Sequence, residues 1–244
     1  MVRDLAIVLA SALFVGCARP STGFLCKSFK AVDGVRVNYT VFVPHDYRPD
    51  RPVPAVLFLH GAGETGTDGR RPSEVGLGPA IKKREATFPF LVVFPQIQAG
   101  PTFASWQPGQ PDGDRAIELF DAVSRDYAVD PDRQYLVGMS IGGFGVWSQA
   151  VHDPWRWAAI VPICGIAPSA RAERLVNVPC WCFHGGRDGN VEVEHSRRMV
   201  AELRRLGSSP RYTEFAEVGH DSWTPAFATD ELYDWLLRQR RRSP

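Results

Sequence analysis

The sequence predicts an α/β fold: a single domain built on a doubly wound, mostly parallel sheet that begins with an antiparallel hairpin. Short apolar runs alternate with longer amphipathic segments along most of the chain, and this alternation is typical of parallel strands joined by helices. A length of 244 residues with a hydrophobic content of 44% suits one domain with a large core.

The hairpin is predicted near the start of this domain. The segments SFKAV (28–32) and VRVNYTVFV (35–43) flank Asp33-Gly34, a dipeptide that favours a tight turn between antiparallel strands. Further strands are expected at 54–60, 90–95, 134–140, 158–164, 180–185 and 211–218, and helices at 113–127, 142–152, 193–206 and 229–239. In such a sheet, functional groups gather at the carboxyl ends of the strands.

Charge and cysteine content exclude several classes of function. The chain has 28 Lys and Arg against 27 Asp and Glu, so it lacks the basic surplus typical of nucleic-acid binding. Residues 240–244 form a basic tail that we expect to be solvated. The spacing of the five cysteines fits neither a zinc site nor a dense disulfide framework. We therefore expect no metal, no cofactor and buried free thiols, with one bridge from Cys26 left open.

The first residues differ in character from the rest. An apolar stretch from Leu5 to Gly16 is too short to span a bilayer and suits a signal peptide over residues 1–16. LFVGC, ending at Cys17, resembles the lipobox of bacterial lipoproteins, which implies a lipid anchor at that cysteine. Residues 17–27 are interpreted as a linker and 28–239 as the catalytic domain. We expect export, either as a periplasmic or cell-surface lipoprotein or as a secreted protein.

A candidate nucleophile lies between a predicted strand and a predicted helix. Residues 138–142, GMSIG, fit the pattern G-x-S-x-G in the context that a nucleophile elbow requires. Small neighbours allow the sharp turn that holds the central hydroxyl, here that of Ser140, out of the sheet. Helix capping by Ser140 is the alternative, but capping does not account for glycine at 138, 142, 143 and 145 together.

A nucleophilic serine needs a base, and His220 is the candidate. His220 follows the last predicted strand, which places it at the same edge of the sheet as Ser140. The acid is expected between them in the chain, just past a strand, and Asp188 stands there. Glu192 and Glu194 are better explained as acidic residues that stabilise a helix start.

Six segments carry a resemblance to a known family. They are LHGAGETGTDG (59–69), VDPDRQYLVGMSIGGFGVW (129–147), VPICG (161–165), HGGRDGNV (184–191), VGHDSW (218–223) and LYDWLL (232–237). The chain resembles the α/β-hydrolase superfamily, and more closely the exported bacterial esterases of the dienelactone hydrolase and carboxylesterase-like group, some of which are described as predicted peptidases. The resemblance implies the α/β-hydrolase fold and a Ser-His-Asp triad.

The resemblance also implies an oxyanion hole made of two backbone N–H groups, those of Ala62 and Ile141. The glycines on either side of Ala62 would let the amides approach a negatively charged oxygen. Glu64 and His60 are expected to bind substrate. For Glu64, which lies on this loop, bracing of the loop and an exposed position are the alternatives, and His60 at the strand end is also expected to shape the site. Trp106 and Trp223 are expected to form walls of the substrate pocket.

These features predict a serine hydrolase of small carboxylic esters, with carbohydrate or plant-derived esters as the favoured substrates. The expected partner is a small-molecule ester, and a membrane is contacted only through the anchor at Cys17. Two alternatives remain: a peptidase similar to prolyl oligopeptidase, and a surface-anchored binding protein without catalysis.

Overall fold

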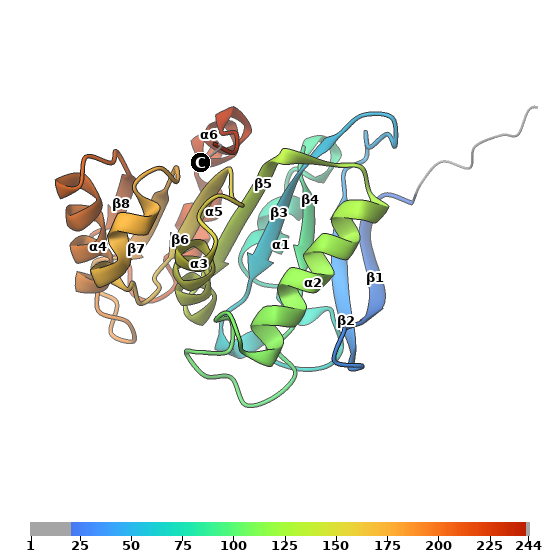
Figure 1. The fold of residues 1–244 in the computed structure, drawn as a ribbon, viewed down its shortest axis with the longest axis horizontal. Helices are drawn as coiled ribbons and strands as arrows, with labels where there is room; N and C mark the ends of the chain where they lie inside the picture. The colour runs from blue at the N-terminus through green and yellow to red at the C-terminus, as the bar shows by residue number, and fades with distance from the viewer. Residues whose placement is uncertain (1–20, 243–244) are drawn as a thin grey trace, which may run out of the picture.

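The structure, a computed structural model, describes residues 21–242, and these residues form one sheet covered by helices on both faces (Figure 1). The sheet has eight strands in the order β1-β2-β4-β3-β5-β6-β7-β8. The strands are β1 (Gly23–Lys30), β2 (Arg36–Val43), β3 (Val53–Leu59), β4 (Leu91–Phe94), β5 (Val129–Met139), β6 (Ala159–Ile163), β7 (Trp181–Gly185) and β8 (Arg211–Phe215). The predicted α/β-hydrolase architecture, with its antiparallel start, is confirmed.

The hairpin forms where the sequence predicts it. β1 and β2 pair antiparallel, and the turn between them contains Gly34 with a φ of 85°, a left-handed conformation that glycine adopts without strain. β2 also pairs antiparallel with β4, whereas β3 pairs in parallel with both β4 and β5. Each strand from β5 to β8 then pairs in parallel with the next.

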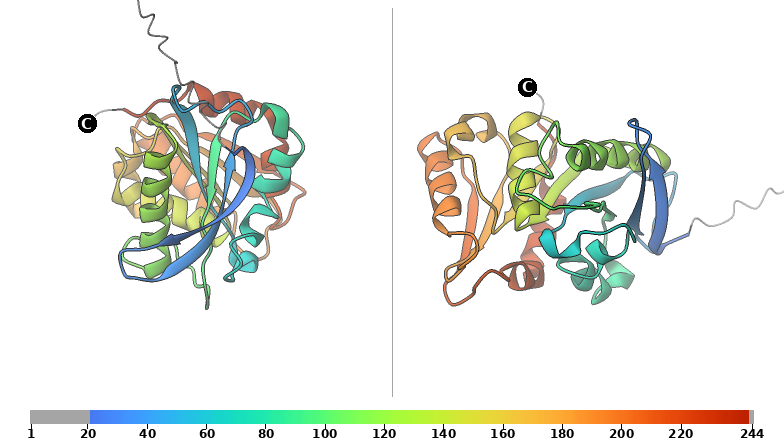
Figure 2. Two further views of the ribbon diagram at one scale, coloured as in Figure 1. Left: turned by 90° about the vertical axis from the view of Figure 1, so that its right-hand side faces the viewer. Right: turned by 90° about the horizontal axis from the view of Figure 1, so that it is seen from below.

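Two apolar layers sandwich the sheet, one on each face. Successive residues of β3 alternate between them: Leu57 belongs to one core cluster and Phe58 to the other. The helices α2 (Pro111–Asp126), α3 (Ile141–His152) and α4 (Glu194–Arg205) cover the first face, whereas α1 (Leu77–Lys82), α5 (Trp223–Ala228) and α6 (Asp230–Arg238) cover the second (Figure 2). Because β3 is buried on both faces, it appears in the sequence as a continuous apolar run.

The helices α1 and α5 were not predicted from the sequence. Each spans six residues, which is less than two turns and too short for the apolar periodicity of a helix to show. Their packing is tertiary: Leu77 and Ile81 of α1 and Phe227 of α5 belong to the same buried cluster. The four longer helices lie within two residues of their predicted bounds.

The predicted start of the catalytic domain, residue 28, is wrong. Gly23 to Lys27 already pair with β2, and the Phe24 ring packs 4.9 Å from that of Phe42 between ring centroids. The folded domain therefore begins at least five residues earlier than the sequence suggested. The predicted signal peptide and Cys17 lie outside the described residues, and their roles stay predictions.

The described part of the basic tail, residues 240–242, contacts the domain, whereas the sequence predicted a solvated tail. The backbone N–H of Arg241 donates to the Asp132 carbonyl at 2.8 Å, and the Arg240 guanidinium lies 3.4 Å from the Asp130 carboxylate. Both acids lie near the start of β5, so the end of the chain docks there. Within residues 21–242, no helix combines the length and apolar character needed to cross a bilayer.

Candidate active site

Ser140 occupies a strained turn between β5 and α3. Its backbone has φ 55° and ψ −121°, a conformation that costs a non-glycine residue free energy and persists only where the surroundings impose it. Its N–H donates to the Ile163 carbonyl of β6 at 2.9 Å. The turn therefore holds the Ser140 hydroxyl above the carboxyl edge of the sheet, in the geometry expected of a nucleophile elbow.

The glycines around Ser140 allow this close packing. A Cβ added to Gly138 would lie 2.5 Å from the carbonyl oxygen of Gly142, and one added to Gly142 would collide with the backbone of Leu59. Any larger residue at these positions would push α3 away from β3 and β5. The spacing G-x-S-x-G is thus explained by contact between the turn and its neighbouring backbone.

Three polar side chains meet at this edge of the sheet. His220, on the loop after β8, places Nε2 3.0 Å from Oγ of Ser140, and its Nδ1 lies 2.8 Å from Oδ2 of Asp188 on the loop after β7. An ionised carboxylate only accepts hydrogen bonds, so Nδ1 carries the proton and Nε2 accepts from the serine hydroxyl. This arrangement lets Ser140 pass its proton to His220.

The second oxygen of Asp188 is held by the backbone. Oδ1 accepts hydrogen bonds from the N–H groups of Asn190 and Val191, both at 2.9 Å. Burial alone would raise the pKa of Asp188, but the hydrogen bonds from Val191, His220 and Asn190 hold it below its ordinary value. Asp188 is therefore ionised at neutral pH and fixed toward His220.

His184, the last but one residue of β7, contacts the Asp188 carboxylate and the loop that carries it. Its Nε2 lies 3.0 Å from the Val191 carbonyl oxygen and 3.3 Å from Oδ2 of Asp188, whereas its Nδ1 lies 2.7 Å from Oγ of Ser196. Burial lowers the pKa of His184, so the ring is neutral. The sequence analysis did not assign this contact, because it depends on the fold of the loop between β7 and α4.

Two backbone N–H groups border the Ser140 hydroxyl. Ile141 is the first residue of α3, and Ala62 begins a short 3₁₀ turn, Ala62–Glu64, after β3. Neither N–H has an intrahelical acceptor, and neither donates to another group within residues 21–242. Both residues line the same cavity as Ser140, so both amides are available to an oxygen placed there.

That cavity has a volume of about 390 Å³. Glu64 and Trp223 line it as predicted, and the edge of the Trp223 ring faces the His220 ring at 5.3 Å between centroids. Four further lining residues were not predicted from the sequence: Phe103, Met139, Asn190 and Val191. The available signal for Phe103 was a second aromatic residue on the loop that carries Trp106, and its ring is 52% exposed.

Two predicted substrate contacts, Trp106 and His60, are wrong. Trp106 is 1% exposed, and its indole N–H donates to the His60 carbonyl at 3.0 Å. The His60 ring is fully buried, with Nδ1 donating to the Gly61 carbonyl and Nε2 accepting from the Ile97 N–H. Both rings pack beneath the loop after β3 and brace it, so they do not reach the cavity.

The Glu64 side chain is mostly buried against this loop, with 12% of it exposed. Its Oε2 lies 3.9 Å from Nδ1 of His60 and, within residues 21–242, has no hydrogen-bond partner. Burial lowers the pKa of His60 to about 4 and raises that of Glu64. His60 is therefore neutral at pH 7, and the two side chains do not form an ion pair.

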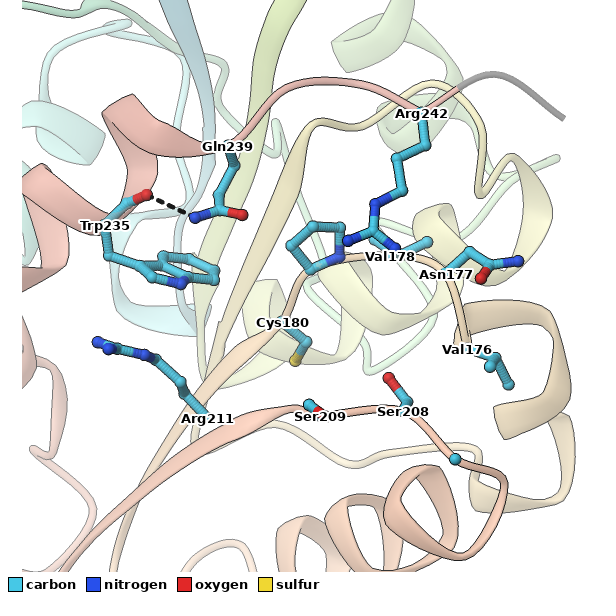
Figure 3. A pocket seen from close by; sticks show the side chains of 12 residues that line it. Val176, Asn177, Val178, Cys180, Ser208, Ser209, Arg211, Trp235, Gln239 and Arg242 are labelled. Carbon is cyan, nitrogen blue, oxygen red and sulfur yellow. Dashed lines mark hydrogen bonds between the residues drawn. The ribbon is translucent and has the colours of Figure 1, made fainter.

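Two further cavities differ from the first. One, of about 470 Å³, shares the Trp223 wall and is lined by charged residues that include Glu74, Lys83 and Asp221. The other, of about 340 Å³, lies at the opposite edge of the sheet, before β7 and β8 (Figure 3). Its lining includes Cys180, Arg211 and Arg242 but no histidine and no acid, so it lacks the groups for nucleophilic catalysis.

Three of the four cysteines within residues 21–242 are buried free thiols, as expected, whereas Cys26 is exposed. Cys26, Cys164, Cys180 and Cys182 form no disulfide among residues 21–242, so the bridge left open for Cys26 does not appear there. Burial raises the pKa of Cys182 to about 12, which makes it an inert packing residue.

A serine hydroxyl that lines a cavity from a strained elbow, next to a histidine and a buried aspartate at the carboxyl edge of a doubly wound sheet, defines the class of α/β-hydrolase serine hydrolases. Comparison with protein families then places the chain within this class. The family described as "Putative esterase" matches residues 32–188, more than half of the chain, and the chain belongs to this esterase family.

Individual relatives agree with this assignment. A solved structure of a thermostable esterase is 34% identical and superposes with a TM-score of 0.79 over 89% of this chain and 63% of its own. The bifunctional acetylxylan esterase/xylanase XynS20E of Neocallimastix patriciarum is 24% identical over 73% of this chain and 25% of its own length. Poly(3-hydroxyalkanoate) depolymerase C of Paucimonas lemoignei is 29% identical over 46% of this chain and 28% of its own. The chain thus spans about a quarter of the length of these curated relatives.

Proposed function

We propose that this chain is a carboxylesterase that cleaves small esters through an acyl-enzyme, with Ser140 as nucleophile, His220 as general base and Asp188 as the acid that orients it. The observation that carries the proposal is the continuous set of contacts from Ser140 Oγ to His220 Nε2, at 3.0 Å, and from His220 Nδ1 to Asp188 Oδ2, at 2.8 Å. Membership of an esterase family supports the same reaction.

The reaction follows from these positions. Ser140 Oγ bonds to the ester carbonyl carbon while its proton moves to His220 Nε2, and Asp188 stabilises the imidazolium that forms. The carbonyl oxygen becomes negatively charged and accepts hydrogen bonds from the N–H groups of Ala62 and Ile141. The C–O bond to the alcohol then breaks, and the alcohol leaves with the proton from Nε2. Water repeats the sequence on the acyl-enzyme and releases the acid.

The two cavities that share Trp223 support a division of the substrate. The cavity at Ser140 has an apolar wall of Phe103, Met139 and Val191, which suits a short acyl group. The neighbouring cavity presents Glu74, Lys83 and Asp221, which suits an alcohol rich in hydroxyl groups. We infer that the substrate is a short-chain ester of a polar alcohol such as a sugar, in agreement with the acetylxylan esterase name of one relative.

The first experiment separates ester from amide chemistry. A fluorophosphonate probe should label the wild-type enzyme and not the Ser140→Ala variant, because only an activated serine reacts. p-Nitrophenyl acetate should then be hydrolysed far faster than aminoacyl p-nitroanilides. The opposite preference would make the chain a peptidase, and absence of labelling would make it a binding protein on a hydrolase scaffold.

The second experiment tests the polar alcohol site. Lys83→Ala and Glu74→Ala should raise KM for an acetylated oligosaccharide and leave kinetics with p-nitrophenyl acetate nearly unchanged, because p-nitrophenol lacks the hydroxyl groups that these charged side chains would bind. Equal effects on both substrates would contradict the division of the cleft, without affecting the assignment of the triad.

A further inference from the structure

A buried thiol lies beside the Asp188–His220 pair. Cys164 follows β6, which lies between β5, the strand before Ser140, and β7, the strand before Asp188. Its Sγ, a carboxylate oxygen of Asp188 and a ring nitrogen of His220 all lie within 4.8 Å of one another. The proposed ester hydrolysis uses the carboxylate and the imidazole but has no role for the thiol.

We propose that Cys164, Asp188 and His220 form an inhibitory site for a thiophilic divalent cation such as Zn²⁺ or Cd²⁺. This inference rests on the proposed function, because it concerns the residues of that same triad. A sulfur, a nitrogen and an oxygen are the donor atoms that Zn²⁺ takes in proteins, at about 2.0 to 2.3 Å each. In a tetrahedral site such atoms lie roughly 3.3 to 3.6 Å apart, so the three side chains, whose donor atoms lie within 4.8 Å of one another, need only small shifts to surround one ion.

Charge balance favours a divalent ion. Binding deprotonates the thiol, and the thiolate together with the Asp188 carboxylate supplies two negative charges against the two positive charges of the metal, while His220 binds as a neutral ligand. Cys164 and the Asp188 side chain are fully buried, so a net charge there would be costly. Mg²⁺ and Ca²⁺ prefer sets of oxygen ligands, and we expect neither to bind.

A second feature beside the thiol is an unsatisfied hydroxyl. Ser222 is fully buried, and its Oγ makes no hydrogen bond within residues 21–242. Burial raises the pKa of the Cys164 thiol to about 12, whereas the Ser222 hydroxyl, which faces the thiol, lowers it. The thiol is therefore protonated without a metal, and a bound cation must displace its proton. A buried polar group without a partner normally has a function or an absent ligand, and here it would support a metal-bound thiolate.

Of the three proposed ligands only His220 lines the substrate cavity, so an ion would have to enter past its ring. The His220 side chain is 20% exposed and lines that cavity together with Ser140. Binding through Nδ1 would displace its proton to Nε2, which could then no longer accept from Ser140. Binding through Nε2 would occupy that acceptor directly. With either nitrogen as ligand, the base is lost, and ester hydrolysis stops while the metal is bound.

The test measures inhibition in enzyme freed of metal by a chelator. Zn²⁺ and Cd²⁺ should abolish hydrolysis of p-nitrophenyl acetate, EDTA should restore it, and Mg²⁺ should have no effect. Cys164→Ser and Cys164→Ala should retain catalysis and raise the inhibition constant for Zn²⁺ at least tenfold. Cys26→Ser, which removes an exposed thiol of β1, is the matched control and should be inhibited as the wild type is. Inhibition of both Cys164 variants at the wild-type concentration would overturn the proposal.

A readout that does not depend on turnover separates this proposal from the proposed function. Cd²⁺ bound to a thiolate gives a charge-transfer band in the ultraviolet, which should appear in the wild type and in Cys26→Ser and be absent in the Cys164 variants. The band would support the metal site even if the chain hydrolysed no ester. If both Cys164 variants fail to fold, Asp188→Asn is used instead: it should weaken the band, and an unchanged band would overturn the proposal.

Discussion

The Nε2 atom of His184 lies 3.3 Å from Oδ2 of Asp188, and both side chains are fully buried. The same nitrogen lies 3.0 Å from the Val191 carbonyl oxygen, so one N–H is shared between a carboxylate and the loop that carries it. Val191 in turn donates its N–H to Oδ1 of Asp188. His184 therefore holds both the acid and its loop in place, although the ring does not line the substrate cavity.

His184→Phe should lower kcat about tenfold and leave KM nearly unchanged, because the ring acts through Asp188 and does not contact substrate. Loss of one hydrogen bond to a charged group corresponds to about 1.5 kcal/mol or more, and tenfold in rate corresponds to about 1.4 kcal/mol. The pH profile of kcat/KM should shift along the pH axis, which a loss of packing alone would not cause. Ser196→Ala, which removes only the partner of Nδ1, is the control and should shift the profile less.

Asp188→Asn should leave the fold intact and slow catalysis by about 10⁴-fold, because an amide at this position would favour the wrong tautomer of His220. Glu192→Gln is the matched control: Glu192 is exposed and lies on the same loop, and its loss should be nearly silent. Steady-state kinetics with p-nitrophenyl acetate would measure both. If Glu192→Gln lost most of its activity while Asp188→Asn kept it, Asp188 would be excluded as the acid.

Ser140→Ala should abolish turnover above the background that the remaining site supports. Adding His220→Ala to it should cost little more, because the two residues act in one proton transfer and their effects are strongly non-additive. A double-mutant cycle on kcat would measure this. Independent losses that multiply would mean that His220 does not serve Ser140.

The fold and the meeting of Ser140, Asp188 and His220 at one edge of the sheet could be predicted because each depends on local features of the sequence. Apolar runs locate the strands, glycines locate the elbow around Ser140, and chain order places Asp188 and His220 at the ends of β7 and β8. The fold then needs only to bring the carboxyl ends of the strands to one edge. The residues that line a cavity are harder to predict, because they depend on the direction in which each side chain of a long loop points.

Trp106 shows why this second kind of prediction failed. Its loop does reach the active site, but the side chain that enters the cavity is that of Phe103, whereas Trp106 turns inward against His60, with their rings 5.0 Å apart between centroids. Burying the larger apolar surface stabilises the loop more. Sequence alone identifies the loop as functional and leaves this choice between two aromatic rings open.

The buried ring of His60 should make stability fall in mild acid. Burial lowers its pKa to about 4, whereas an unfolded histidine titrates near pH 6.5. Between these values the unfolded chain binds a proton that the folded chain excludes, so the free energy of unfolding declines as pH falls from about 6.5 to about 4. At 1.36 kcal/mol per unit, the loss amounts to about 3 kcal/mol.

Urea unfolding of the wild type and of His60→Asn at neutral pH and near pH 4.5 would measure this contribution. The variant should be less stable at neutral pH, because it loses buried contacts, but its stability should decline less on acidification. Equal declines in the two proteins would show that other groups carry the acid sensitivity.

Ala62→Pro is expected to reduce kcat sharply, because proline removes the N–H that would stabilise the oxyanion, and loss of one such donor costs about 3 to 4 kcal/mol. The backbone suits this substitution. Ala62 is the first residue of a 3₁₀ turn, a position that tolerates proline, and Gly61 before it is extended, with φ −80° and ψ −173°, as a residue before proline prefers. Proline therefore removes the donor with little reason to distort the loop.

Ala62→Gly is the matched control, because it changes the side chain and keeps the N–H, so most activity should remain. KM should change less than kcat in the proline variant, since the donor meets charge that develops only in the transition state. Circular dichroism and the melting temperature would establish that both variants fold. A folded Ala62→Pro enzyme with near-normal kcat would remove Ala62 from the oxyanion hole and leave Ile141 as the sole backbone donor proposed there.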